Sequence, residues 1–360
     1  MFLHVGVAKT GTTYLQRNLW LNRKRLRKHG VLYPGDTHAA HFHASLDLRD
    51  TTFHHSADDV AGAWPRLVEE TNAWSGAAVI SHEMFARTPP DKIQVAVGDF
   101  APAEVRVVLT VRDLGRQLPA VWQERLKNRD HQTFSEFLEA VMAAAPLGRA
   151  QSSGLDEPFW IPQDVAAVAE RWAAVVRPES IILVTVPPSG ADRSELWRRF
   201  SEAVELPAVD YERDNLRSNE SLGTAETELL RRFNARLPDD YPWPAYRRQI
   251  KRSFAKETLA AQRTHGSLSV PQPWQRQVDE VASATIAALT EGGYRVVGRL
   301  EDLRPVAAPA GAVMPDDLTD GQLLDVALDV LRDAVTKQTE PAEQAGEAPP
   351  RWKRRPRPKP

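Results

Sequence analysis

The N-terminal segment constrains the fold more than any other part of the sequence. Its apolar run Phe2–Val7 predicts a short buried strand, and the residues GVAKTGTT at 6–13 lead directly into a predicted helix. A strand that enters a helix through a Gly/Thr turn presents backbone N–H groups and the positive end of the helix dipole to an anion. The segment therefore predicts an anion-binding loop, to which Lys9 adds a cation and Thr12 and Thr13 add hydroxyl groups.

The order of residues in this loop differs from that of a Walker loop. The Walker motif GxxxxGK[ST] places a lysine directly before Ser or Thr. Here Lys9 comes two residues before Gly11, and no lysine follows Gly11 in the loop. This order argues against a P-loop kinase or NTPase, which stays open as an alternative, as does a plain strand–turn–helix with a surface lysine.

Apolar strands and amphipathic helices alternate along the first part of the chain. Further strands are predicted at Val31–Tyr33, Ala77–Ile80, Val105–Val111 and Ile181–Val186. Such alternation predicts a parallel sheet whose strands are joined by crossover helices. Residues 36–58 are rich in His and Asp without a period and read as a loop. We therefore expect an α/β fold of three layers, a central parallel sheet flanked by helices, with a mostly helical C-terminal part that includes a partly irregular cap at 238–275.

Polar residues stand at the carboxyl ends of the predicted strands. They form the groups Lys9–Thr13, Ser81-His82-Glu83 and Arg112-Asp113. In open parallel sheets, ligands bind in the crevice outside the carboxyl ends of the strands. We therefore expect these groups, which are far apart in the sequence, to share one site.

The loop and a later strand together resemble a known family. The residues AKTGTTYL at 8–15 are similar to the 5′-phosphosulfate-binding loop of PAPS-dependent sulfotransferases (PAPS is 3′-phosphoadenosine-5′-phosphosulfate), whose pattern is close to PK[ST]GTT.[LW]. Ala8 stands where many members have Pro. The strand VVLTVRD, which ends in Arg112-Asp113, resembles the 3′-phosphate motif of the same family. The resemblance covers about residues 2–225 and implies the P-loop NTPase-like sulfotransferase fold.

The resemblance implies that PAPS is the co-substrate and that no metal is required. It assigns the 5′-phosphate to the loop, the oxygen that bridges phosphate and sulfate to Lys9, and the 3′-phosphate to Arg112. Many members carry a serine eight residues after this arginine, where the present chain has Ala120. A late loop of related enzymes covers the 3′-phosphate, which suggests Asn219 and Ser221; helix capping is a full alternative explanation of both. The donor-binding residues expected on this basis are Lys9, Thr10, Gly11, Thr12, Thr13, Arg112, Asn219 and Ser221.

The base that removes the proton of the acceptor is predicted from His82 and Glu83. Family members place a His or a Glu on the acceptor side of the nucleotide, and both residues directly follow the strand Ala77–Ile80. Consecutive residues beyond a strand end point in different directions, so we expect one of them to face the pocket and slightly prefer Glu83. A cap or a salt bridge is the alternative role for each. The catalytic residues expected are thus Lys9, Glu83 and His82.

The acceptor is expected to be a hydroxyl or an amine of a small molecule or a glycan. A non-catalytic nucleotide-binding relative stays open as an alternative. The spacing of the histidines between the second and third strands fits no zinc pattern, and a solvated loop explains them. These histidines are His38, His41, His43, His54 and His55.

Composition limits the class of protein further. The chain contains no cysteine, no apolar run of membrane-spanning length and no signal-peptide pattern, which together predict a cytoplasmic protein. The net charge is −2 although residues 351–360 hold six basic residues and no acidic one. The rest of the chain is therefore acidic, which argues against a nucleic-acid partner.

The sequence also predicts how the chain is divided. We expect a sulfotransferase domain at 1–303, with the nucleotide-binding core at about 1–225 and a helical acceptor cap at about 226–303. A linker at 304–317, an amphipathic helix at 318–337 and a disordered, basic, Pro-rich tail at 338–360 follow. Thr319 and Gln322 predict a capping box for that helix. Its apolar face is expected to consist of Leu324, Leu328, Leu331 and Val335.

Overall fold

Six parallel strands form one central sheet in the part of the chain that the computed structural model describes. The described residues are 1–52, 57–147, 158–192, 194–213, 221–262, 266, 268–308 and 312–337. The strands are β1 (Phe2–Gly6), β2 (Val31–Leu32), β3 (Ala77–Ser81), β4 (Arg106–Val111), β5 (Ile181–Thr185) and β6 (Arg295–Val297), in the spatial order β2-β3-β1-β4-β5-β6. Because every neighbouring pair is parallel, the carboxyl ends of β3, β1 and β4 lie side by side at one edge of the sheet.

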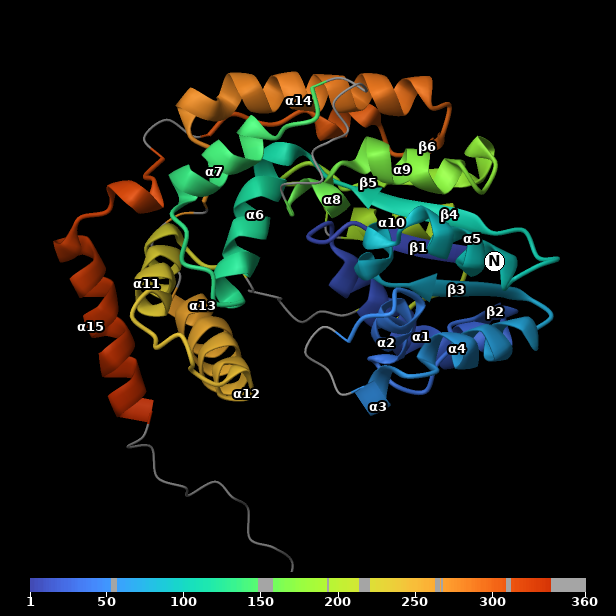
Figure 1. Cartoon of the computed structure of the whole chain (residues 1–360), viewed down its shortest axis with the longest axis horizontal. Coiled ribbons are helices and arrows are strands. Elements are labelled where there is room, and N and C mark those ends of the chain that lie inside the picture. Colours follow the sequence, from blue (N-terminus) through green and yellow to red (C-terminus); the bar gives the residue numbers. More distant parts are fainter. Residues whose placement is uncertain are drawn as a thin grey trace, which may run out of the picture.

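Helices cover both faces of this sheet (Figure 1). Alternate residues of β4 face opposite sides, so that Val107 and Leu109 pack into one apolar core and Val108 into another. The first core includes residues of η1 (Glu83–Arg87), α4 (Ala63–Asn72), α5 (Pro90–Gly98), α9 (Val165–Ala173) and α14 (Gln272–Glu291), and the second includes residues of α1 (Thr12–Lys28) and α10 (Ser194–Ala203). The predicted three-layer α/β fold is confirmed. The short strand β6 was not predicted, because only Val297 of its residues is buried.

A helical part lies beside the sheet and has its own apolar core (Figure 1). Its elements include α6 (Leu114–Lys127), α7 (Phe134–Ala143), α11 (Thr224–Asn234), α12 (Trp243–Ala245), η5 (Tyr246–Leu259) and α13 (Ala260–Gln262). The mostly helical C-terminal part is therefore confirmed. Within the expected irregular cap, however, the chain is helical from Trp243 to Gln262.

The spacing of buried residues explains why that helix was missed. The segment η5 has π-helical geometry, and its buried residues are Tyr246, Ile250, Ala255 and Leu259. These positions recur every four or five residues, which exceeds the 3.6-residue period of an α-helix. A search for α-helical periodicity therefore finds no clear signal there.

The expectation of a loop at 36–58 is wrong. The structure has helices α2 (Ala40–Leu48) and α3 (Ala57–Val60) in this region. The buried face of α2 consists partly of polar residues, since His41 and Ser45 are buried together with Ala44 and Leu48. These polar residues hide the apolar periodicity of the helix in the sequence. The buried imidazole of His41 also needs hydrogen-bond partners from elsewhere in the fold.

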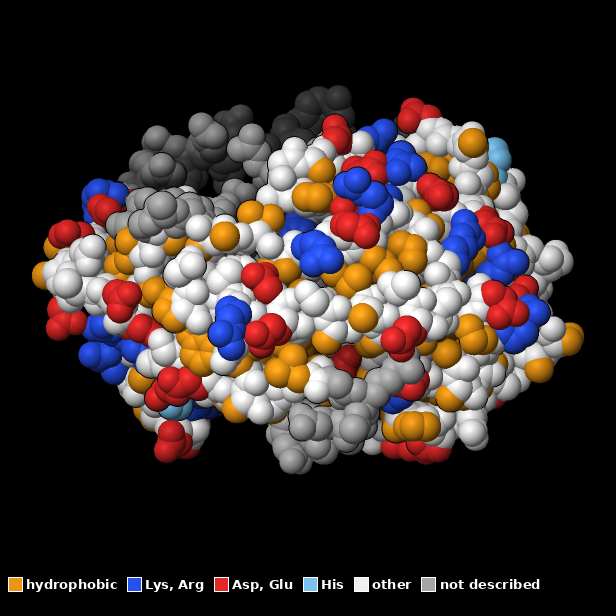
Figure 2. Space-filling model, turned by 90° about the horizontal axis from the view of Figure 1, so that it is seen from above, with side chains coloured by type: hydrophobic (Ala, Val, Ile, Leu, Met, Phe, Trp, Pro, Cys, Tyr) orange, Lys and Arg blue, Asp and Glu red, His pale blue; other side chains and the backbone are white. Residues whose placement is uncertain are grey.

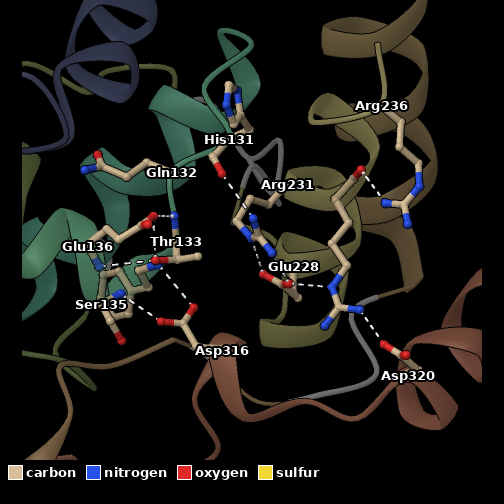
Figure 3. A network of polar contacts seen from close by, with 12 residues as sticks. His131, Gln132, Thr133, Ser135, Glu136, Glu228, Arg231, Arg236, Asp316 and Asp320 are labelled. Atoms are coloured by element: carbon tan, nitrogen blue, oxygen red, sulfur yellow. Dashed lines mark hydrogen bonds and ion pairs between the residues drawn. The ribbon is translucent and has the colours of Figure 1, made fainter.

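A network of polar contacts ties the C-terminal helices to α7 (Figure 3). Asp316, in the short helix η7 (Pro315–Asp317), accepts hydrogen bonds from the backbone N–H groups of Phe134 at 3.2 Å and Ser135 at 2.8 Å. The buried carboxylate of Glu228 pairs with Arg232, which also contacts Asp320 at 2.5 Å. The segment expected to be a linker is therefore fixed to the helical part at its C-terminal end.

The last described helix, α15 (Asp320–Lys337), begins at the predicted capping box, because Thr319 and Gln322 bond each other's backbone N–H groups. The predicted apolar face does not pack inward. Leu323, Val326 and Val330 are buried, whereas the residues of the predicted face are exposed. The helix thus has two apolar stripes, and the one not predicted packs inward. The exposed residues are Leu324, Leu328, Leu331 and Val335.

The surface seen from above in Figure 1 carries charges of both signs. Lys and Arg side chains lie close to Asp and Glu side chains over this face (Figure 2). Among the helices of the described ranges, none combines the length and the apolar character needed to cross a membrane.

Candidate functional site

The loop that joins β1 to α1 turns sharply through residues in the left-handed backbone region. The φ angle is +82° at Gly6, +68° at Lys9 and +87° at Gly11. Glycine adopts such angles readily, whereas a residue with a side chain pays about 1 to 3 kcal/mol. The surroundings of Lys9 therefore hold it in a strained conformation, which is a common property of functional loops.

The peptide groups of this loop turn their carbonyls toward the protein. Thr10 Oγ1 donates to the Val7 carbonyl, Gln117 Nε2 to the Ala8 carbonyl, and Arg112 Nη1 to the Lys9 carbonyl at 2.9 Å. Within the described residues, the backbone N–H groups of 8–13 have no protein acceptor. Unpaired N–H groups in a row at a helix N-terminus form an anion-binding arrangement.

A chain of buried hydrogen bonds fixes the loop to the sheet beneath it. The bonds join Ser81 Oγ to His4 Nδ1 at 2.7 Å, His4 Nε2 to Thr110 Oγ1 at 3.2 Å, and Thr110 Oγ1 to Thr10 Oγ1 at 2.6 Å. Thr10 gives its only hydroxyl proton to the Val7 carbonyl, so Thr110 donates the bond between the two threonines. His4 must then donate through Nε2–H to Thr110. Burial lowers the pKa of His4 to about 3, so the imidazole is neutral and its Nδ1 accepts from Ser81.

The predicted ligands of the 5′-phosphate differ in where their side chains lie. The Thr10 hydroxyl is fully buried in that chain, so only its backbone can reach a ligand. Thr12 is buried and bonds to the carboxylate of Glu83. Thr13 is exposed, and its hydroxyl is accessible to a ligand. Gly11 packs so closely on Leu196 that an added Cβ would overlap that side chain.

Glu83 and His82 follow β3 and have different surroundings. Glu83 Oε2 accepts a hydrogen bond from Gln16 Nε2 at 3.0 Å, and Thr12 bonds to the same carboxylate. Burial alone would raise the pKa of Glu83, but the nearby His82 and these hydrogen bonds together lower it, so the carboxylate is charged at neutral pH. His82 Nδ1 instead accepts the Met84 N–H at 3.1 Å and caps η1. The basic nitrogen of a neutral His82 is therefore already occupied.

A carboxylate of the helical part holds the side chain of Lys9. Lys9 Nζ lies 2.7 Å from Glu124 Oε2, and Lys251 Nζ lies 3.0 Å from Glu124 Oε1. Burial alone would raise the pKa of Glu124, but the two lysines lower it to about 2. Sequence reasoning did not identify Glu124. The signal was an acid between the buried Trp122 and Leu126 of one helix.

Arg112 supports the loop at the end of β4. Besides its bond to the Lys9 carbonyl, it has a buried Nε without a partner among the described residues. Burial, and then the neighbouring Arg116, lowers the pKa of Arg112 to about 10. Asp113 caps α6 by accepting the Arg116 N–H at 2.9 Å and pairs with the Arg116 side chain. The adjacent acid is therefore engaged by a different arginine.

The segment before α11 reaches the same helix that follows Arg112. Gln123 of α6 donates to the Leu222 carbonyl at 3.0 Å, and Ser221 Oγ donates to Gln123 Oε1 at 3.4 Å. Gln123 comes one turn after Ala120, the position at which a hydroxyl was expected and is missing. Asn219 lies outside the described residues.

A cavity of about 440 Å³ lies between the loop, η1, α6 and the short helix α8 (Trp160–Gln163). Its polar lining includes Lys9, Glu83, Glu124, Arg49 and Arg87. Apolar walls come from Met84, Val121 and Phe159. The structure thus brings Lys9 and Glu83 to one cavity, whereas His82 is not part of its lining.

His41, which lies in the segment expected to be a loop, has structural partners. His41 Nδ1 accepts the Ser81 N–H at 2.9 Å and His41 Nε2 bonds to the Pro34 carbonyl at 2.7 Å, so this ring is neutral with its proton on Nε2. In the described part of the chain, no group of three or more His, Cys, Asp or Glu side chains is placed to hold a metal ion. His54 and His55 lie outside the described residues.

Comparisons with known proteins give one structural match. No family model matches the chain, and no curated protein matches it in sequence. A crystal structure of a sulfotransferase from Alicyclobacillus acidocaldarius matches with 17% sequence identity and a TM-score of 0.36, and the match covers 59% of this chain and 83% of that one. A similarity at this level does not establish a family.

Proposed function

We propose that this protein is a PAPS-dependent sulfotransferase that transfers a sulfuryl group to a hydroxyl or an amine of a small-molecule or glycan acceptor. The observation that carries the proposal is the row of N–H groups at 8–13, which no described residue accepts, beside Lys9 and at the rim of the cavity that Glu83 lines. A phosphate bound to these groups would place its sulfate at the cavity. A cation and a charged carboxylate then lie on either side of the reacting atoms.

The two charged groups suit the two halves of sulfuryl transfer. The acceptor oxygen or nitrogen forms a bond to sulfur as the bond between sulfur and the bridging oxygen breaks. Glu83 takes the proton of the acceptor, and Lys9 with the loop N–H groups stabilises the charge that grows on the departing phosphate. Lys9 has to exchange Glu124 for that phosphate, so the ion pair at 2.7 Å marks its resting position.

We assign the 3′-phosphate to Arg112, with help from the segment before α11. The buried Nε of Arg112 is a donor that lacks an acceptor in the described part of the chain, and its Nη1 already contacts the Lys9 carbonyl. One side chain would then connect the two phosphate positions. Ser221, held against α6 by Gln123, and Asn219 are the proposed additional contacts. The proposal requires no metal ion.

The test is calorimetric titration of the full chain with adenosine 3′,5′-bisphosphate and, separately, with ATP and Mg²⁺. The bisphosphate carries both phosphates that the loop and Arg112 are proposed to bind, so we expect it to bind more tightly by on the order of a hundredfold. Preferential binding of ATP would favour the P-loop kinase or NTPase and overturn the proposal. Tight bisphosphate binding without sulfation of any offered acceptor would favour a non-catalytic relative.

A further inference from the structure

Two arginines line the cavity and lie far along the sequence from the residues proposed to bind PAPS. Arg49 follows the C-terminus of α2, and Arg87 is the last residue of η1. Both are half-buried and both belong to the lining of the cavity that Lys9 and Glu83 share. The helix α2, which the sequence did not reveal, is what brings Arg49 to this place.

Neither guanidinium has a partner among the described residues. No hydrogen bond or ion pair joins the Arg49 or Arg87 side chain to another described group, and Arg49 Nη1 is buried without an acceptor. Burial, and then the charge of Arg87, lowers the pKa of Arg49. Burial also lowers the pKa of Arg87. Two cations that are partly desolvated and repel each other are costly unless an anion joins them.

The other charged groups around the cavity are already engaged. Glu124 pairs with Lys9 and Lys251, and Arg125 pairs with Asp130 at 2.7 Å. The carboxylate of Glu83 is bonded by Gln16 and Thr12. Among the described residues of this lining, Arg49 and Arg87 are thus the cations that pair with no other group.

We propose that Arg49 and Arg87 bind an anionic group of the acceptor, so that the substrate accepted by this cavity is an acid that carries a carboxylate or a sulfate. Guanidinium forks bind the paired oxygens of such groups in a planar, bidentate arrangement. Apolar walls at Met84, Val121 and Phe159 suit the carbon skeleton between the acid and the reacting hydroxyl. That the bound acid is the acceptor rests on the proposed sulfotransferase function, whereas the anion site itself does not.

The test compares probes of similar size that differ in charge. Calorimetry of the full chain is done with 4-hydroxybenzoate, 4-hydroxybenzenesulfonate and the neutral 4-hydroxybenzamide, each with and without adenosine 3′,5′-bisphosphate. We expect at least one anionic probe to bind about tenfold more tightly than the amide. The order of the two anionic probes shows whether a carboxylate or a sulfate-like group is preferred.

Variants show which side chains cause the preference for anionic probes. Arg49→Gln and Arg87→Gln should each remove most of it, and Arg49→Lys should retain part of it, because the charge remains while the fork is lost. Arg66→Gln is the matched control, since Arg66 is exposed on α4 and bonds the Ala61 carbonyl. Equal affinity for charged and neutral probes in the wild type, or a preference that survives both glutamine variants, overturns the inference.

The two proposals fail in different ways. Loss of bisphosphate binding in the wild type with an intact preference for anionic probes would sink the sulfotransferase function and keep the anion site. Tight bisphosphate binding in all variants, together with no preference for anionic probes, would leave the nucleotide site in place and remove the acidic acceptor.

Discussion

Glu83 and His82 show how two adjacent polar residues take different roles. Glu83 lines the cavity, and its carboxylate is kept charged by His82, Gln16 and Thr12. His82 uses Nδ1 to cap η1 and lies outside the lining. The sequence places both at the end of a strand, but the direction of each side chain follows from the turn into η1. The proposed choice of Glu83 over His82 as the base therefore depends on the fold.

The base can be tested with two near-isosteric changes. Glu83→Gln keeps the hydrogen-bonding shape and removes the proton acceptor, so we expect turnover to fall by roughly 10²- to 10⁴-fold. His82→Asn keeps an oxygen that accepts the Met84 N–H, so we expect turnover within a few-fold of the wild type. The measurement is steady-state kcat with saturating PAPS. A loss in His82→Asn as large as that in Glu83→Gln would make His82 the base.

Other residues of the site illustrate what a sequence can and cannot show. Lys9 and Gly11 were recognisable because the loop is contiguous. Glu124, Arg49 and Arg87 belong to elements that meet the loop only in the folded chain. No local pattern marks them, since each looks like an ordinary charged residue of a helix or its end.

At the scale of elements, the end of β1 passes very close to η1 where the loop begins. The Cα and Cβ atoms of Glu83 lie 2.6 Å from the position that a Cβ on Gly6 would occupy. Only glycine lets the end of β1 pass η1 at this distance. The sequence indicates a strand followed by a turn here, but it does not indicate which segment comes against the glycine.

Gly6→Ala should therefore displace the carboxylate as well as destabilise the fold. Gly30→Ala is the matched control, because Gly30 has φ +83° against +82° at Gly6 and nothing within 4 Å of an added Cβ. We expect Gly30→Ala to lower the free energy of unfolding by about 1 kcal/mol and leave turnover unchanged. Gly6→Ala should cost more and reduce turnover. Equal effects of the two changes, measured by urea unfolding and kcat, would contradict the role given to Gly6.

At the scale of the whole molecule, the fold was more predictable than its details. Strands β3, β4 and β5 are almost entirely buried and consist mostly of Val, Ile, Leu and Ala, which leaves a strong signal. α2 and η5 were missed because polar burial hides the period of one and π geometry changes the period of the other. Which of the two apolar stripes of α15 packs inward depends on its contact with α11, which lies far away in the sequence.

Two buried imidazoles link the sheet to the loop and to α2, and they make the stability of the molecule depend on pH. Burial lowers the pKa of His4 to about 3 and that of His41 to about 4, from 6.5. The unfolded chain thus binds more protons than the folded one below pH 6.5, and stability present above that pH is lost as the pH falls toward 4 and then 3. Near pH 5.5 we expect the free energy of unfolding to fall by about 2 to 3 kcal/mol per pH unit.

The measurement is urea unfolding between pH 7.5 and pH 5. His41→Gln can still donate to the Pro34 carbonyl and accept the Ser81 N–H but does not titrate. It should therefore reduce the slope clearly, and His4 and His82, whose pKa burial also lowers, account for the rest. His29→Gln, at an exposed position just after α1, is the matched control and should keep the full slope. A flat profile from pH 6.5 to 5 in the wild type would show that the two rings are not the neutral links between sheet, loop and α2. The direction of the hydrogen bond from Ser81 to His4 Nδ1 would then be wrong as well, because only a neutral His4 can accept at that nitrogen.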